Sequence, residues 1–326
     1  MKHALVTLFD NSYVIAAAAM LKSFARNSKA GERPAIYLLL DSVTQENLTH
    51  LVTILTKHSL EYVVVDMNEW LNAMPHIPTR GHVSRTAYFK AFIPDILPGT
   101  FHTALYIDPD VIFLRNIKQL YRYDISSNPL GAVVDPYLPK DGLEVFNSGV
   151  MLLNLSYLRK IGLAEAFFNV ALQNKETIKE RNDQPVFNIL FSKSFLELPL
   201  TYNYIVHDLR ERKKFLWRPH IVHFAGSKKP WHVVSTHRYR RAFRFYLRGT
   251  VWEGASSDPV DWQYRYEAYI PWSFRKWFDR WEVWQGKPFT ERTFRMYRKY
   301  YIEKFVPYFV RIRYENAKAK VRKLMK

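Results

Sequence analysis

Asp108 and Asp110 stand two residues apart, in the tripeptide D-P-D, where a run of apolar residues ends. The run Ala104–Ile107 has the composition of a buried strand, and apolar residues resume at once with Val111. Two neighbouring carboxylates suit a hard divalent cation, which keeps its other positions for water and substrate phosphates. A surface turn is the competing interpretation, because Asp and Pro are ordinary turn formers. The apolar flanks favour the metal site.

The elements that must position this pair alternate between strand and helix patterns. We expect strands at 3–7, 35–40, 62–65, 103–107, 131–134, 149–153 and 220–223. We expect helices at 13–24, 44–55, 84–97, 158–172 and 184–190. This alternation predicts an α/β fold with a mostly parallel sheet covered by helices on both faces. Ligands bind at the carboxyl edge of the strands in such a sheet, which is where the carboxylate pair is placed.

Composition excludes several classes of protein. The 326 residues are enough for one large domain with an extension, and the absence of cysteine excludes disulfides and thiolate chemistry. Met1 runs directly into a strand pattern, so we expect no signal peptide, and no apolar run is long enough to cross a bilayer. These features predict a cytoplasmic protein that does not span a membrane.

The net charge of +18 is concentrated in the C-terminal part of the chain. Residues 232–326 hold about 22 Lys and Arg against about 9 Asp and Glu, or about +13. Six of the nine tryptophans also lie there, and Gly254–Pro259 resembles a linker before two helical patterns at 264–280 and 293–323. We therefore expect a domain at 1–231 and a basic, aromatic extension at 232–326.

Four more segments accompany the carboxylate pair, each with polar groups beside an apolar element. They are the first strand-to-helix turn Leu8–Tyr13, the strand Phe146–Leu155 (F-N-S-G-V-M-L-L-N-L), the helix start Asn182–Asn188 (N-D-Q-P-V-F-N) and His223–Trp231 (H-F-A-G-S-K-K-P-W). The set, in this order, resembles family 8 of the retaining glycosyltransferases. That family includes bacterial lipopolysaccharide α-glucosyl- and α-galactosyltransferases and, more distantly, glycogenin. The resemblance covers about residues 4–231.

The resemblance implies a GT-A nucleotide-sugar-binding fold, a UDP-glucose or UDP-galactose donor, a manganese (or magnesium) ion, and transfer with retention at the anomeric carbon. Asp108 and Asp110 match the family's metal-binding carboxylates, and His223 matches its third protein ligand. Gly226 would let the backbone approach the diphosphate, since any side chain would block the approach, and Lys229 would contribute positive charge.

Asp10 and Tyr13 match the family's nucleotide-binding turn, where a carboxylate can accept from the uracil N–H and a ring can stack on the base. A helix N-cap by Asp10 or Asn11 is the structural alternative and is compatible with binding. Lys90 stands where the family usually has Arg, so the positive charge is kept but the bidentate fork is lost. Pro185 is a second departure from the family pattern.

The resemblance implies that Gln184 and Asp183 are the catalytic residues, and it places the amide of Gln184 beneath the anomeric carbon of the donor sugar. A double displacement needs a nucleophile beneath the anomeric carbon, and retaining hydrolases use a carboxylate there. An amide is a poor nucleophile, so front-face substitution is the simpler mechanism, with Gln184 stabilising the oxocarbenium-like centre. Asp183, Asp135, Asn147 and Ser148 match the family's donor-sugar and acceptor contacts, although a helix-cap or turn role is also open for each of them.

Three interpretations of the extension stay open. Tryptophan, tyrosine and basic residues suit an anionic membrane surface, and peripheral attachment to the inner face of the plasma membrane fits a glycolipid acceptor such as lipopolysaccharide core. Packing of aromatic helices on the catalytic domain is the second interpretation, and nucleic-acid binding is the least favoured. A non-catalytic nucleotide-sugar-like module, recruited by the basic extension, is the alternative function. The presence together of residues suited to bind a metal and a diphosphate argues against this alternative.

Overall fold

The computed structural model describes residues 3–75, 77, 85–135, 145–174, 183–205, 219–226, 229–232, 235 and 237–255. The chain divides into two compact units, one made of residues 1–205 and 214–223 and the other of residues 206–213 and 224–326. This division falls a little before the boundary expected at Trp231. Most of the expected extension, including both of its helical patterns, lies outside the residues described, so the assignment of that region stays a prediction.

A seven-stranded sheet forms the centre of the first unit, in the order β3-β2-β1-β4-β7-β6-β8. Its strands are β1 (Ala4–Asp10), β2 (Ala35–Asp41), β3 (Tyr62–Asp66), β4 (Thr103–Ile107), β6 (Leu130–Val134), β7 (Phe146–Asn154) and β8 (Leu196–Glu197). β1 pairs in parallel with β2 and β4, β2 with β3, and β6 with β8. Only β7 runs against its neighbours, β4 and β6. The prediction of a mostly parallel sheet is therefore confirmed.

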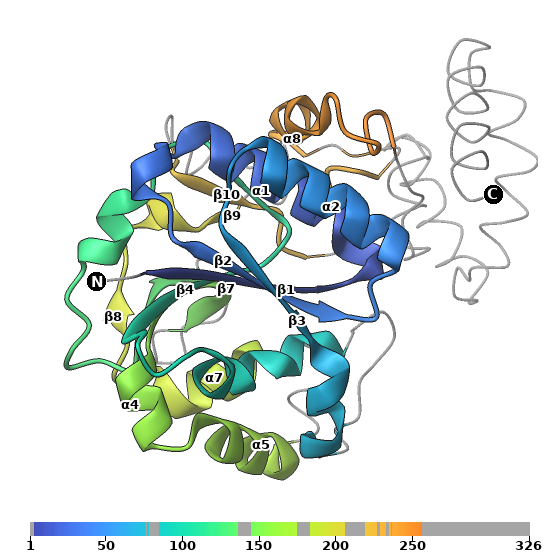
Figure 1. The fold of residues 1–326 in the computed structure, drawn as a ribbon. Coiled ribbons are helices and arrows are strands. Elements are labelled where there is room, and N and C mark those ends of the chain that lie inside the picture. Colours follow the sequence, from blue (N-terminus) through green and yellow to red (C-terminus); the bar gives the residue numbers. More distant parts are fainter. Residues whose placement is uncertain are drawn as a thin grey trace, which may run out of the picture. The chain divides into compact units, whose positions relative to one another are not determined.

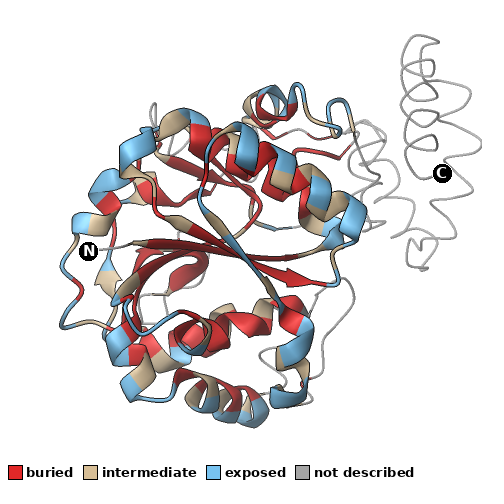
Figure 2. Cartoon of the chain, viewed as in Figure 1, coloured by how far each residue is buried: buried red, intermediate tan, exposed pale blue. Residues whose placement is uncertain are grey.

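Helices cover both faces of this sheet (Figure 1). α1 (Val14–Asn27) and α2 (Gln45–Lys57) lie on one side, while α4 (Leu155–Lys160), α5 (Leu163–Gln173) and α7 (Gln184–Phe191) lie on the other. The central strands are buried along almost their whole length, as expected for strands covered on both faces (Figure 2). In α1 the run Ala16–Ala19 is fully buried, so the strands it covers meet small side chains.

Short helices complete the connections. They are α3 (Ile93–Ile96) and the 3-10 segments Asn11–Tyr13, Ala30–Glu32, Met67–Ala73, Arg85–Phe92, Lys118–Arg122 and Leu200–Tyr202. The helical pattern expected at 84–97 is thus a 3-10 helix that continues into one turn of α-helix. The single helix expected at 158–172 is wrong in one respect: α4 ends before Gly162, whose φ of +63° is a left-handed conformation that favours glycine, and α5 begins after it.

A second, small sheet lies at the end of the first unit and was not expected as a separate sheet. It contains β5 (Val111–Phe113), β9 (Tyr204–Ile205) and β10 (Ile221–His223), in the order β5-β10-β9. β10 runs antiparallel to β5 with Val111 opposite His223. This pairing places the last residue of β10 beside the first residue of β5, directly after Asp110.

In the second unit, α8 (Arg240–Leu247) has a buried and an exposed face. Phe243, Tyr246 and Leu247 are buried, whereas Arg241 and Arg244 are exposed. The Phe243 ring lies 5.5 Å from the rings of both Phe224 and Trp231. Across the part of the chain that is described, no helix combines the length and the apolar character required to cross a bilayer.

Candidate metal centre and active site

Strand ends bring the predicted site residues together. β1 and β4 are parallel, and β7 runs antiparallel to β4, so β7 begins at the edge where β4 ends. The backbone N–H of Asp108 donates to the carbonyl of Gly149 at 2.8 Å, which continues the β4–β7 pairing by one residue. The carboxylate loop 108–110 therefore lies against the start of β7, and the β5–β10 pairing brings His223 to the same place.

Asp108, Asp110 and His223 form a compact group of possible metal ligands, with one ligand atom from each lying within 4.8 Å of the others. His223 Nε2 lies 3.4 Å from Asp110 Oδ1 and 3.8 Å from Asp108 Oδ2. Neighbouring vertices of an octahedron with ligand distances of about 2.1 Å are about 3.0 Å apart, and opposite vertices about 4.2 Å apart. The two separations lie between these values, so the three residues fit one six-coordinate cation with about half of its positions left for other ligands.

Gly149 is the residue that makes room for this group. A Cβ atom at Gly149 would lie 2.3 Å from His223 Cε1 and 2.7 Å from Asp108 Oδ2. Both distances are far below a van der Waals contact, so any side chain here would push two of the three ligands away. The glycine of the F-N-S-G motif is therefore required by the close approach of the ligand side chains.

Lys90 is the buried cation of the site. Its Nζ lies 2.8 Å from Asp183 Oδ2 and 3.1 Å from Asp108 Oδ1, and its side chain is 4% exposed. Burial lowers the pKa of Lys90, but the attraction of Asp108 and Asp183 outweighs it, so that the pKa lies above its ordinary value and the ammonium stays charged. Burial is also the main reason why the pKa of Asp183 is raised; Lys90 opposes this shift and Asp108 adds to it.

The ammonium of Lys90 thus lies between the carboxylates of Asp108 and Asp183, while the third carboxylate, Asp110, lies beside His223. A divalent cation held by Asp108, Asp110 and His223 would offset the remaining negative charge. Tyr106 adds to the orientation of Asp108, because its hydroxyl donates to Asp108 Oδ1 at 2.5 Å. Burial, and then the charge of Asp108, raise the pKa of Tyr106 well above its ordinary value, so this hydroxyl remains a donor.

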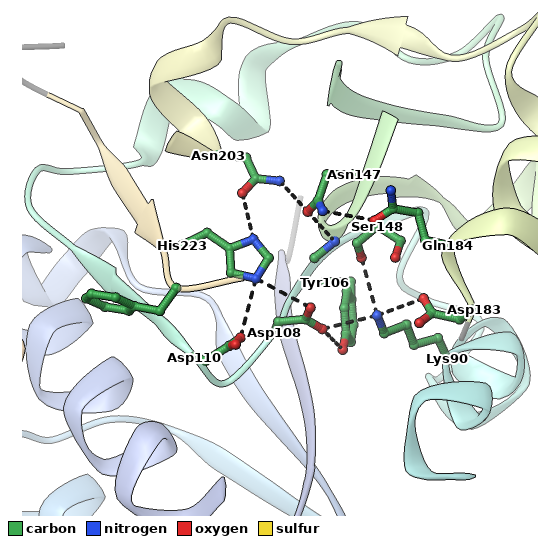
Figure 3. A network of polar contacts seen from close by, with 12 residues as sticks. Lys90, Tyr106, Asp108, Asp110, Asn147, Ser148, Asp183, Gln184, Asn203 and His223 are labelled. Atoms are coloured by element: carbon green, nitrogen blue, oxygen red, sulfur yellow. Dashed lines mark hydrogen bonds and ion pairs between the residues drawn. The ribbon is translucent and has the colours of Figure 1, made fainter. Parts of the chain in front are cut away.

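A row of amide side chains runs from the metal group to Gln184 (Figure 3). His223 Nδ1 lies 2.9 Å from Asn203 Oδ1, and Asn203 Nδ2 donates to Asn147 Oδ1 at 2.8 Å. Asn147 Nδ2 donates to Gln184 Oε1 at 2.9 Å, and Gln184 Nε2 donates to Asp135 Oδ2 at 3.1 Å. The predicted residues Asn147, Gln184 and Asp135 therefore lie in one network with His223.

The neighbours of this row are also predicted residues. Asp183 precedes Gln184 at the start of α7 and binds Lys90, as described above. The carbonyl oxygen of Ser148 lies 3.5 Å from Lys90 Nζ. Asn188, one turn into α7, donates to the carbonyl of Phe146 and accepts from its N–H, which ties α7 to the start of β7.

Asp10 and Tyr13 lie at the carboxyl end of β1. Asp10 Oδ1 accepts from the backbone N–H and the hydroxyl of Ser12, so the expected N-cap is present, on a 3-10 turn that leads into α1. Tyr13 ends that turn and is half-buried. Their role toward a nucleotide stays a prediction.

Gly226 and Lys229 belong to the second unit and are described within it alone. Gly226 has a φ of +81°, a left-handed conformation that a side chain would strain. Lys229 is 8% exposed, and its Nζ donates to the carbonyl of Phe224 at 2.9 Å and lies 5.9 Å from the centre of the Trp231 ring. Their role toward a diphosphate also stays a prediction.

Asn203 and Tyr106 were missed by sequence reasoning. Asn203 is 1% exposed and follows the 3-10 turn Leu200–Tyr202. The available signal was a polar amide inside the otherwise apolar and aromatic stretch that leads into β9. Tyr106 resembled an ordinary strand residue, because nothing in the sequence shows that its hydroxyl donates to Asp108.

Comparisons with known proteins agree with the family resemblance seen in the sequence. The model of the family described as Glycosyl transferase family 8 matches residues 4–235. General stress protein A of Bacillus subtilis is 26% identical over 79% of this chain and 97% of its own length. The Lipopolysaccharide 1,2-glucosyltransferase of Escherichia coli is 28% identical over 53% of this chain and 57% of its own length. Against two streptococcal glycosyltransferases, the chain spans only 25% and 26% of their length.

Among solved structures, the galactosyltransferase LgtC, in complex with donor and acceptor sugar analogues, has a TM-score of 0.62 at 19% identity. The match covers 81% of this chain and 99% of that one. At this identity the likeness establishes the fold, and the expected GT-A fold is confirmed.

Proposed function

The chain belongs to glycosyl transferase family 8, and from this we propose that it transfers a hexose, glucose or galactose, from a UDP-sugar to a glycan or glycolipid acceptor. We propose further that transfer depends on a divalent metal and retains the configuration at the anomeric carbon. The observation that carries the proposal is the group Asp108, Asp110 and His223, which is connected through amides to Gln184.

Asp108, Asp110 and His223 would hold Mn²⁺ or Mg²⁺. The bound cation would supply positive charge to the leaving diphosphate as the glycosidic bond breaks. The two carboxylates and the imidazole are held before any ligand arrives, because Tyr106, Lys90 and the β5–β10 pairing fix them. Such preorganisation lowers the free-energy cost of binding.

Lys90 links the metal-binding carboxylate to the residue that precedes Gln184. Its ammonium bonds Asp108 on one side and Asp183 on the other, so it holds the loop after β4 and the start of α7 at a fixed separation. We infer that the main role of Lys90 is to hold these two segments together. Its two ion contacts would replace the bidentate contact that the arginine of the family pattern could make.

Gln184 is the residue that we place beneath the anomeric carbon. An amide does not form a stable covalent glycosyl adduct as a carboxylate does, so front-face substitution fits this residue better than a double displacement. Its Oε1 carries a partial negative charge, which would stabilise an oxocarbenium-like centre. Asp135 and Asn147 hold both ends of the amide, and so they would fix which atom faces the sugar.

A membrane-bound acceptor is supported by the relative from Escherichia coli and by the charge of the extension. That relative is described as acting in lipopolysaccharide glucosylation. In α8 Phe243 and Tyr246 are buried, whereas Phe245, Arg241 and Arg244 are exposed, so basic groups and one aromatic ring are available there to an anionic surface. We propose peripheral attachment to the cytoplasmic face of the plasma membrane through this basic surface and the residues that follow it.

The test is binding of a panel of nucleotide sugars, with Mn²⁺ and with EDTA, measured by thermal shift and saturation-transfer NMR. We expect UDP-hexoses to bind only with the metal, and the Asp110→Asn variant to lose this difference. Undiminished turnover in excess EDTA, or equal binding of all nucleotides, would contradict the proposal.

A further inference from the structure

Asn203 stands between the possible metal ligand His223 and the amide row that ends at Gln184 (Figure 3). Its Oδ1 faces His223 Nδ1 at 2.9 Å, and its Nδ2 faces Asn147 Oδ1 at 2.8 Å. With a side chain only 1% exposed, it leaves little room for water to replace either bond. Asn203 comes from the segment before β9, which contributes none of the predicted site residues.

The direction of this row is fixed independently at two points. Asp135 presents a carboxylate, which only accepts, so Gln184 must turn its Nε2 toward Asp135 and its Oε1 toward Asn147. The backbone N–H of Gly149, which only donates, lies 3.0 Å from Asn147 Oδ1. Both constraints require the same orientation of the Asn147 amide.

That orientation determines the next two partners. Asn147 Oδ1 accepts, so Asn203 must donate with Nδ2 and accept with Oδ1. Asn203 Oδ1 accepts, so His223 must carry its hydrogen on Nδ1. Its Nε2, the atom that faces Asp108 and Asp110, is then left with a lone pair for a metal.

We propose that Asn203 is a positioning residue that couples the metal ligand His223 to Gln184. One end of its side chain fixes the ring of His223, and the other end fixes the amide of Gln184 through Asn147. This inference rests on the proposed function. A ligand histidine usually donates its other ring N–H to a carboxylate, a carbonyl or water, and loss of such a partner weakens metal affinity by about 10- to 100-fold. Here the partner is the side-chain amide of Asn203. Its nitrogen donates to Asn147, on the side of the proposed sugar site.

Two variants separate the two ends of Asn203. Asn203→Asp keeps an oxygen for His223 but cannot donate to Asn147, so it breaks the row on the Gln184 side alone. Asn203→Leu removes both bonds at similar volume. Mn²⁺ binding in the presence of UDP is measured by EPR, turnover by release of UDP, and folding by thermal unfolding.

For Asn203→Asp we expect the Mn²⁺ dissociation constant to stay within about threefold of the wild type, or to become tighter, while kcat falls about 10- to 100-fold. For Asn203→Leu we expect both to worsen by about 10- to 100-fold. In a Gln184→Ala background, Asn203→Asp should change kcat by less than about threefold, because residues that act through one another are not additive.

Asn154→Asp is the matched control. Asn154 is also a buried amide of this sheet, and it donates to the carbonyls of Ile125 and Asn128 away from the site. It should lose stability but keep Mn²⁺ affinity and kcat.

A wild-type kcat in Asn203→Asp, or an equal loss of Mn²⁺ affinity in both Asn203 variants, would overturn the inference while leaving the proposed function intact. An Asn203→Asp chain that fails to fold, when Asn154→Asp folds, would assign Asn203 to the core and overturn it too. Failure of the wild type to bind Mn²⁺ and UDP would instead overturn the proposed function.

Discussion

Replacing Gly149 by alanine is the sharpest perturbation of the proposed metal site, because it adds one methyl group and removes no ligand. The new Cβ would lie 2.3 Å from His223 Cε1 and 2.7 Å from Asp108 Oδ2. To reach an ordinary contact of about 3.4 Å, the imidazole must move by about 1 Å and the carboxylate oxygen by about 0.7 Å. Metal–ligand distances tolerate only about 0.2 Å, so the two ligands can no longer serve one ion.

We expect Gly149→Ala to reduce Mn²⁺-dependent UDP affinity by at least about 100-fold, since the displaced histidine and carboxylate are both proposed ligands. The added methyl should also destabilise the protein by about 1–3 kcal/mol, as overpacking does. Isothermal titration calorimetry with UDP and Mn²⁺ gives the first quantity, and denaturant unfolding in EDTA gives the second.

Gly131→Ala is the control for this experiment. Gly131 lies in β6 of the same sheet, and a Cβ there would meet the Leu198 side chain at 3.4 Å, an ordinary contact. The control should keep UDP affinity. A Gly149→Ala variant that folds and binds Mn²⁺ and UDP as tightly as the wild type would refute the assignment of His223 and Asp108 to one ion.

Three further predictions concern the ligands, the amide and the extension. Asp110→Asn should nearly abolish transfer while the fold stays intact, because one carboxylate ligand is lost; UDP release at saturating Mn²⁺ and circular dichroism check this. Gln184→Ala should lower kcat far more than it weakens UDP binding, because its proposed contact is to the sugar; a matching loss of UDP affinity in calorimetry would contradict this. A chain ending at Pro259 should still bind Mn²⁺ and UDP but should lose cosedimentation with anionic vesicles, since each basic residue near such a surface contributes about 1 kcal/mol; equal binding of the full-length chain to anionic and zwitterionic vesicles would favour the packing interpretation.

The strands and the position of the carboxylate pair could be predicted because their signals are local. The apolar run 103–107 is observed as β4 with the same bounds, and the carboxylates that follow it lie at the carboxyl edge of the sheet, as expected. A strand that is buried on both faces is an uninterrupted run of apolar residues. The end of the run can therefore be recognised without knowing which strands lie beside it.

The antiparallel direction of β7 and the small β5–β10–β9 sheet could not be predicted from local sequence signals. Strands of two or three residues carry too little periodicity, and the direction of a strand depends on where the chain returns to the sheet. The closeness of His223 to Asp110 follows from the pairing of Val111 with His223, which joins residues far apart in sequence. For the same reason Asn203 and the spatial requirement at Gly149 became visible only when these elements were seen together.

The configuration of the product is the strongest test of metal-dependent, retaining transfer by this protein. Purified protein is incubated with an α-linked UDP-hexose, Mn²⁺ and an acceptor glycan, and the proton coupling at the new anomeric centre is measured by NMR. We expect the small coupling of an α linkage, formed only when metal is present. A β linkage, or the same product in excess EDTA, would contradict it.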